Sequence, residues 1–276
     1  MKPLFISQHA IRTMFHICRP ARGDSSRFGL SCVQLTIEKH TVRVIACDNA
    51  AAHITEIPCD NAAAINASDT NENDVPQFST SAESVSILVP KDASDKIAGL
   101  KPLPGFACMI ELKRENGKTV CSLTYKDGRD KIRVLCFECS ELRFPDYRNF
   151  AFNFSDPSGW IESPAGHLSE MLTPPTWTKI SLNGHAIAQG FRRDMEDLNL
   201  QPISKKQKPK NERDFRYGGE IETAIDGNRA AAFLDVIPSG NETRLNIFDS
   251  DSAIHIRSKI GEVSALAVIM PLSECR

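Results

Sequence analysis

The feature that most constrains the fold is an approximate internal repetition of the pattern of helices and strands. A helix after Pro90 and a last strand near 129–138 recur as a helix near 227–237 and a last strand near 263–270, about 135 residues later. A repeat of this length has the size of a domain and is too long for a solenoid unit. The chain of 276 residues is therefore predicted to contain two duplicated domains.

The first half begins with an amphipathic helix. Ser7 precedes apolar residues at helical spacing, which predicts an N-capped helix over 7–18 whose polar face carries His9, Arg12 and His16. The later patterns of this half predict strands at 27–37, 41–47 and 53–57, a long polar loop at 60–83, a strand at 85–89, a helix at 91–100, and strands at 106–114, 118–126 and 129–138.

The second half repeats this order less clearly. The expected elements are a helix at 165–172, strands at 176–182 and 185–190, a basic loop at 202–216, a strand at 217–225, a helix at 227–237, and strands at 243–249, 252–258 and 263–270.

Two helices and many antiparallel strands in each half predict an α+β fold with the helices packed on one face of the sheets. The outer strands are then left as edges, which must be covered or paired. A head-to-tail contact between copies pairs such edges and can close into a ring. The helices would line the hole of that ring, so their exposed faces are where charge matters.

The formal net charge of −2 excludes a uniformly basic nucleic-acid coat but allows basic residues to gather on one face. Asp92, Asp95 and Asp226 dilute such a face, and a solvated helix surface is the alternative reading. Phosphates need only loosely spaced positive charges, which gives affinity without sequence readout. The residues predicted to face duplex DNA are Arg12, Arg19, Arg22, Arg27, Lys91, Lys96, Lys101 and Arg229.

Metal, redox and enzyme chemistry find little support in the sequence. The nine cysteines are expected to be reduced and mostly buried, in a cytoplasmic protein. Cys136 and Cys139 have the spacing of half a zinc site, but no second such pair exists, and residues three apart in a strand point to opposite faces. No phosphate-binding loop or hydrolase motif is present, and no window has the roughly 18 apolar residues of a membrane span. The protein is expected to be no enzyme and to need no cofactor.

Several segments carry a resemblance to a known family. Arg143-Phe144-Pro145-Asp146-Tyr147-Arg148 resembles the linker between the second and third domains of the bacterial DNA polymerase III beta subunit, the sliding clamp. Two further segments resemble the family in order and spacing, Ala46-Cys47-Asp48-Asn49-Ala50-Ala51-Ala52 as a degraded form of its segment and Val268-Ile269-Met270-Pro271-Leu272. Ile87-Leu88-Val89-Pro90-Lys91 is also similar to a segment of the family.

This resemblance implies a DNA-clamp fold made of the second and third domains of that family, the first being absent. The implied limits are one domain at 1–142, a linker at 143–150 and a second domain at 151–276. The family closes its ring with six domains from two subunits, so two-domain chains would need three copies. A homotrimer is therefore expected.

The resemblance also implies a groove beside the linker that receives short peptide motifs from a DNA polymerase, a clamp loader or other clamp-binding proteins. Asn49-Ala50-Ala51-Ala52 stands where the family has Gly-His-Arg-Leu, which removes a cationic side chain and bulk from the pocket wall. The positions that match the groove are Leu30, Cys47, Asn49, Ala50, Ala51, Ala52, Pro145, Asn149, Phe150, Val268, Ile269, Met270, Pro271 and Leu272.

The function predicted from these features is that of a sliding clamp, a processivity factor that encircles double-stranded DNA and tethers a polymerase or another DNA-processing partner. The alternative is a clamp-like regulator that closes no ring and competes with or blocks a host clamp. The shortened chain and the altered groove keep this alternative open.

Overall fold

The structure, a computed structural model, describes residues 3–23, 29–38, 40–48, 50–58, 85–103, 105–146, 156–172, 177–181, 187–191, 216–249 and 252–271. The chain divides into two compact units. Unit 1 comprises Met1–Cys47 with Ile54–Pro145, and unit 2 comprises Asp48–His53 with Asp146–Arg276. The predicted domain limits stay a prediction, because positions 147–155 lie outside the described residues.

Unit 1 contains two sheets, one of them formed by the outermost strands in the order β1-β6-β7-β8, with every neighbouring pair antiparallel. Its strands are β1 (Leu4–Ser7), β6 (Ala107–Glu115), β7 (Lys118–Lys126) and β8 (Ile132–Glu138). The other sheet has the order β5-β2-β3-β4, made of β5 (Val85–Val89), β2 (Val33–Ile37), β3 (Thr41–Cys47) and β4 (Ala51–Pro58). The first residues of β4 group with unit 2.

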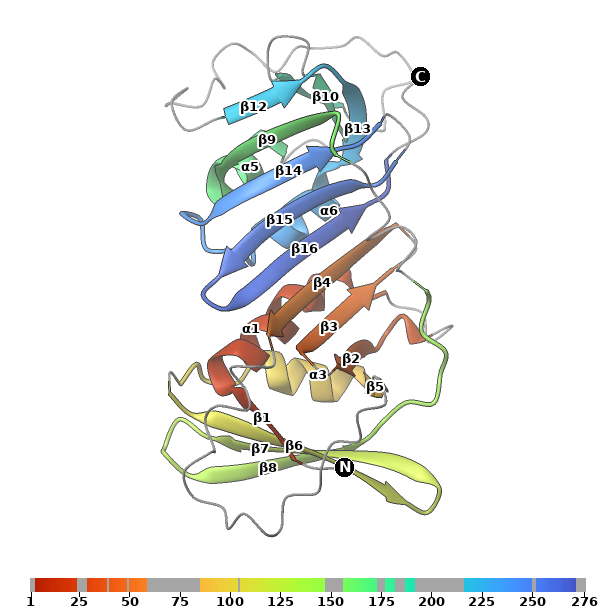
Figure 1. The fold of residues 1–276 in the computed structure, drawn as a ribbon, viewed down its shortest axis with the longest axis vertical. Helices are drawn as coiled ribbons and strands as arrows, with labels where there is room; N and C mark the ends of the chain where they lie inside the picture. The colour runs from red at the N-terminus through yellow and green to blue at the C-terminus, as the bar shows by residue number, and fades with distance from the viewer. Residues whose placement is uncertain are drawn as a thin grey trace. The chain divides into compact units, whose positions relative to one another are not determined.

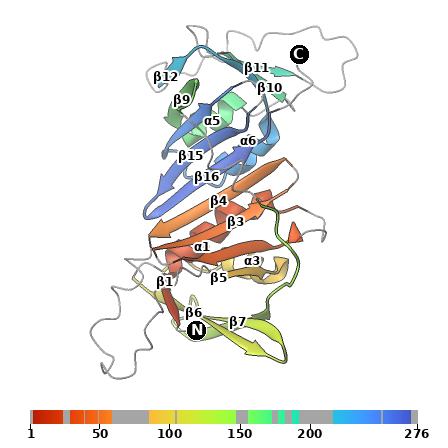
Figure 2. The same ribbon diagram turned by 45° about the vertical axis from the view of Figure 1, so that its right-hand side comes forward.

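Unit 2 is built from two sheets as well, and Figure 2 shows β10 and β11 side by side within it. One sheet has the order β12-β9-β14-β15-β16, made of β12 (Arg216–Gly219), β9 (Gly159–Pro164), β14 (Glu242–Ile247), β15 (Ile254–Ile260) and β16 (Val263–Ile269). The other has the order β11-β10-β13, made of β11 (Ile187–Phe191), β10 (Trp177–Ser181) and β13 (Glu222–Asp226).

The two units repeat the same topology. The order β1-β6-β7-β8 of unit 1 corresponds to β9-β14-β15-β16 of unit 2, and β5-β2-β3 corresponds to β13-β10-β11. The duplication predicted from the sequence is thereby confirmed. β8 and β16 are therefore equivalent strands.

Among the described residues, each unit carries two α-helices that pack against each other, α1 (Gln8–Cys18) with α3 (Lys91–Ala98), and α5 (Ala165–Leu172) with α6 (Gly227–Leu234). Figure 1 shows α1 and α3 together behind strands β2 to β4. The Ser7 hydroxyl caps α1 by accepting from the Ala10 amide at 3.3 Å, as the sequence predicted. The largest fully buried side chains include Ile6, Ile11, Met14 and Phe15 in unit 1, and Ile161, Leu168, Leu172 and Phe233 in unit 2.

Several predicted bounds are wrong for local reasons. The strand predicted at 27–37 begins only at Val33, because Gly29 adopts φ 68° and directs the chain into a turn. The strand predicted at 217–225 is two strands, β12 and β13, which separate after Gly219 at φ 95°. The helix predicted at 227–237 ends at Leu234.

Two strands, β1 and β9, were not predicted at all. β1 has only four residues before the helix cap, and β9 follows the linker without a clear preceding turn. The loop at 60–83 and residues 202–215 of the basic loop lie outside the described residues. No helix in the described ranges is long and apolar enough to cross a membrane.

Candidate nucleic-acid interface and peptide groove

The polar face of α1 places one arginine between two histidines. His9, Arg12 and His16 share this face because they are spaced three and four residues apart, and all three are half-buried. Nε of Arg12 and Nδ1 of His9 are buried, and neither atom has a hydrogen-bond partner among the described residues. Burial, together with the positive charges of Arg12 and Arg19, lowers the pKa of His16. The polar face of α1 thus carries the positive charge of Arg12.

Arg19 and Arg22, which follow α1, both bind one acidic residue of α3. Arg22 lies 2.7 Å from the carboxylate of Asp95, and Arg19 lies 3.3 Å from the same carboxylate. The side chain of Arg22 is 8% exposed, whereas that of Arg19 is 56% exposed. Arg22 therefore joins α1 to α3 and offers little surface to a ligand, while Arg19 keeps an accessible charge.

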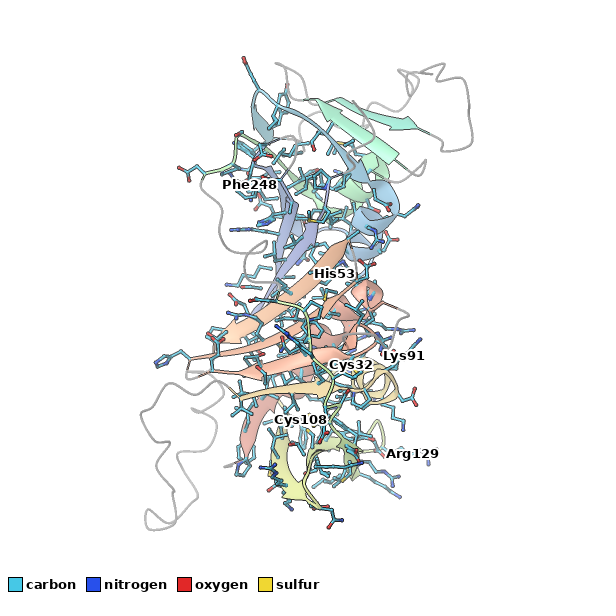
Figure 3. The ribbon with its side chains drawn as sticks, turned by 90° about the vertical axis from the view of Figure 1, so that its right-hand side faces the viewer. Cys32, His53, Lys91, Cys108, Arg129 and Phe248 are labelled. Carbon is cyan, nitrogen blue, oxygen red and sulfur yellow. The ribbon has the colours of Figure 1, made fainter. Side chains whose placement is uncertain are left out.

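The basic residues in and after α3 are accessible. Lys91, Lys96 and Lys101 are exposed, and none has an ion pair within the described ranges. Figure 3 shows Lys91 at the start of α3. Asp92, also exposed, lies beside them and reduces the local positive charge. Arg27 lies outside the described residues.

Arg229 on α6 is held by two carboxylates of unit 2. It forms ion pairs with Asp48 and, at 3.3 Å, with Asp226. Asp226 also caps α6, accepting from the amides of Asn228 and Arg229 at 2.9 and 3.3 Å. Two neighbouring acids largely neutralise Arg229, so its contribution to a positive surface is smaller than the sequence predicted.

The Asp48 carboxylate organises the segment that begins the predicted groove. It accepts from the amides of Ala50 and Ala51, both at 2.8 Å, and from Arg229. Burial acts to raise the pKa of Asp48, but these hydrogen bonds outweigh it and hold the pKa below its usual value. The turn between β3 and β4 is therefore fixed by a charged carboxylate.

Some of the predicted groove residues offer surface and others belong to the cores. In unit 2 the Met270 amide donates to the Ala50 carbonyl at 2.9 Å, and the Met270 side chain is 43% exposed. Ala50, Pro145 and Pro271 are half-buried. The groove positions that are buried are Leu30, Cys47, Ala51, Ala52, Val268 and Ile269. Positions 49, 149, 150 and 272 lie outside the described residues.

Four buried thiols stay protonated at neutral pH. Burial raises the pKa of Cys18, Cys108 and Cys121 to about 12 and that of Cys139 to about 11. Cys136 is exposed, and Cys139, three positions on, is buried. Within the described ranges, no group of three or more His, Cys, Asp or Glu side chains is placed to hold a metal ion.

The sequence reasoning missed the basic character of the β7–β8 turn. Arg129 and Lys131 are both exposed there, and Gly128 of the same turn lies against Lys101. The sequence of this segment predicts a hairpin turn and does not indicate that Lys101 lies nearby. Its proximity to Lys101 arises from tertiary structure.

Comparison with known proteins found no matching family model and no match among curated proteins. Solved structures do match. The DNA polymerase III beta subunit of Pseudomonas aeruginosa is 16% identical with a TM-score of 0.70, over 99% of this chain and 66% of that chain. The beta subunit of Thermotoga maritima is 15% identical with a TM-score of 0.68, over 98% of this chain and 65% of that chain.

A third structure, a putative DNA polymerase III beta subunit from Eubacterium rectale, is 14% identical with a TM-score of 0.67, over 99% of this chain and 66% of that chain. The chain thus spans slightly less than two thirds of the length of each of these proteins. The resemblance found in the linker and the flanking motifs is confirmed for the fold. Across nearly all of its length, this chain has the fold of the bacterial DNA polymerase III beta subunit, the sliding clamp.

Proposed function

We propose that the protein is a sliding clamp, a non-enzymatic processivity factor that encircles duplex DNA in the cytoplasm and tethers a polymerase or another DNA-processing partner. The observation that carries this proposal is the sliding-clamp fold over 98–99% of the chain. The mechanism is topological: a closed ring cannot leave DNA sideways, and weak phosphate contacts leave it able to move along the duplex.

Ring closure requires an available edge, and β8 supplies one. β8 is the last strand of its sheet, and Ile132 and Val134 on it are 68% and 58% exposed. On the equivalent strand β16, Val263, Ala265 and Ala267 are buried. An exposed apolar edge strand is prone to aggregation unless another chain covers it. This contrast supports a head-to-tail contact between copies through β8.

Three copies are proposed for the ring. Six domains close the ring of the three-domain family, and a chain of two duplicated units reaches six with three copies. A contact that joins β8 of one copy to a different surface of the next copy is heterologous, and such contacts close into rings when the rotation between copies permits.

The DNA-facing surface in this proposal consists of the polar face of α1 and the lysines in and after α3. Arg12, Arg19, Lys91, Lys96 and Lys101 are its principal charges. The proposed site for partner peptides in unit 2 is the accessible surface formed by Ala50, Met270 and Pro271. An extended peptide with an apolar anchor would suit such a partly apolar surface beside a strand.

Retention on DNA of different topology tests the proposal. The protein is assembled on nicked circular DNA, alone or with a clamp-loading extract, and half of the sample is linearised. A clamp stays on the circle and is lost from the linear DNA. Equal loss from both would overturn the proposal, and a monomer in solution that binds a full-length clamp would favour the regulator instead.

A further inference from the structure

A cluster of three basic side chains lies at one end of β7 in unit 1. Arg129 and Lys131 belong to the β7–β8 turn, and Lys101 follows α3; all three are exposed. A Cβ atom on Gly128, in the same turn, would lie 3.2 Å from Cδ and 3.8 Å from Nζ of Lys101. Lys101 therefore extends across the turn, and we name these three residues the basic corner.

The acidic residues of the turn are bound to other partners. Asp130 forms an ion pair with Lys126 at 3.1 Å, and Asp127 forms one with Arg133 at 3.0 Å. Asp127 also accepts from the amides of Arg129 and Lys131 at 2.8 and 3.0 Å. None of the three basic-corner side chains has an ion pair among the described residues, so their charges are not neutralised locally.

The backbone beneath the basic corner is held by one buried amide side chain. Gln8 is fully buried, and its Nε2 donates to the carbonyls of Lys101 and Lys126, both at 2.9 Å. Its Oε1 accepts from the Lys126 amide at 2.9 Å. Gln8 thus joins the start of α1, the segment after α3 and the end of β7. The backbone that carries Lys101 is therefore held against the end of β7.

The basic corner adjoins the helix surface described above. Gln8 is the first residue of α1, and Arg12 lies one turn further along the same helix. Figure 3 shows Lys91 and Arg129 on the same side of unit 1. A polyanion that contacts the polar face of α1 and the lysines of α3 would therefore find further positive charge at the β7–β8 turn.

We propose that the basic corner is a phosphate-binding site for the backbone of duplex DNA, with Arg129 and Lys131 as contacts additional to Lys101. The identity of the ligand as duplex DNA rests on the proposed function. Three point charges at loose spacing suit backbone phosphates and provide no sequence readout. The site is sequence-independent and sensitive to salt.

The experiment compares two double variants that each remove two positive charges from opposite ends of β7. Arg129→Gln with Lys131→Gln alters the basic corner, and Lys113→Gln with Arg114→Gln is the matched control near the β6–β7 turn. All four side chains are exposed, so the variants keep the fold. Binding to a short linear duplex is measured by fluorescence anisotropy from 50 to 200 mM salt.

Two lost phosphate contacts reduce the slope of log K against log salt by about 1.8. Over a fourfold change in salt, the wild type then loses about 12-fold more affinity than the basic-corner variant, while the control keeps the wild-type slope. Equal slopes for wild type and basic-corner variant, or equal reductions in both variants, would overturn the inference.

A second measurement identifies the ligand. Acetylation of Lys101 and Lys131 by an amine-reactive ester is followed by mass spectrometry with no ligand, with duplex DNA or with polyglutamate. Protection by the duplex alone supports the inference, and protection by polyglutamate but not by the duplex contradicts it. The basic corner is tested with a linear duplex, whereas the ring is tested by retention on circular DNA. Loss of retention on circular DNA would therefore contradict the proposed ring without contradicting the proposed phosphate-binding site.

Discussion

The guanidinium of Arg22 lies 2.7 Å from the carboxylate of Asp95, with only 8% of the arginine side chain exposed. Arg22 also donates to the Lys91 carbonyl at 3.2 Å and to the Ser94 hydroxyl. One side chain therefore fixes the position of α3 against the segment that follows α1. Both helices belong to the surface proposed to face DNA, so this contact sets the spacing of its charges.

Replacing Arg22 should destabilise unit 1. In Arg22→Ala the Asp95 carboxylate and the Lys91 carbonyl each lose one of their donors in a largely buried contact, and we expect the free energy of unfolding to fall by about 1–3 kcal/mol. Urea denaturation followed by circular dichroism measures this. Arg19→Ala is the control, because Arg19 binds the same carboxylate from an exposed position, and it should cost at most about 1 kcal/mol. Equal losses in both variants would contradict the structural role of Arg22.

The Asp48 carboxylate should stabilise unit 2 in a pH-dependent manner. Its pKa is lower in the folded protein than its usual value, so its contribution is complete above the unfolded pKa of about 3.9 and is lost as the pH falls through the folded pKa. Between pH 5 and 7 we expect the free energy of unfolding of Asp48→Asn to be about 1–2 kcal/mol lower than that of the wild type.

This difference between wild type and Asp48→Asn should shrink below pH 4. Urea unfolding across the pH range measures it, and Glu170→Gln, an exposed acid on α5, serves as the control with no pH-dependent difference. A gap between wild type and Asp48→Asn that persists unchanged at low pH would show that the carboxylate charge is not its source.

The pKa of His16 should respond to charge on the same helix face. Burial and the charges of Arg12 and Arg19 lower this pKa, so Arg12→Gln should raise it toward 6.5. Titration of the imidazole by NMR measures the shift, with Lys113→Gln as a remote control that should leave it unchanged. An unchanged pKa in Arg12→Gln would mean that burial and Arg19 cause the lowering without a contribution from Arg12. On the proposed function, bound duplex DNA should also raise it.

Charge on β8 should prevent assembly without unfolding the chain. Val134 is 58% exposed, so Val134→Lys removes little buried surface but places a charge on the proposed contact. We expect its mass in solution by light scattering to fall from that of three chains to that of one. Leu142→Lys, at a residue 46% exposed beyond the end of β8, is the control and should keep the wild-type mass. A trimer formed by Val134→Lys would exclude β8 as the contact.

Much of the fold could be predicted because local patterns agree with it. Ser7 and the apolar spacing after it identified α1, and the turn residues around Gly117 placed the ends of β6 and β7. β1 and β9 could not be found in this way. A strand of four to six residues is defined by its partners, and β9 pairs with β14, whose residues are about 80 positions away.

The site was harder to predict than the fold. The sequence identified the basic residues, but not which of them would be neutralised. Arg22 and Asp95 are 73 positions apart, and Arg229 and Asp48 are 181 positions apart. Pairs at such separations form only in the folded chain. The accessibility of Arg19 and the engagement of Arg22 follow from that packing.

The equivalence of β8 and β16 has a consequence for mixtures of chains. A head-to-tail contact has two unlike ends, so a chain whose β8 edge is blocked still presents its other end to a neighbour. Such a chain would join an assembly and stop its growth at that point. On the proposed function, a minor population of blocked copies would prevent ring closure, because one blocked copy among three would leave the circle open.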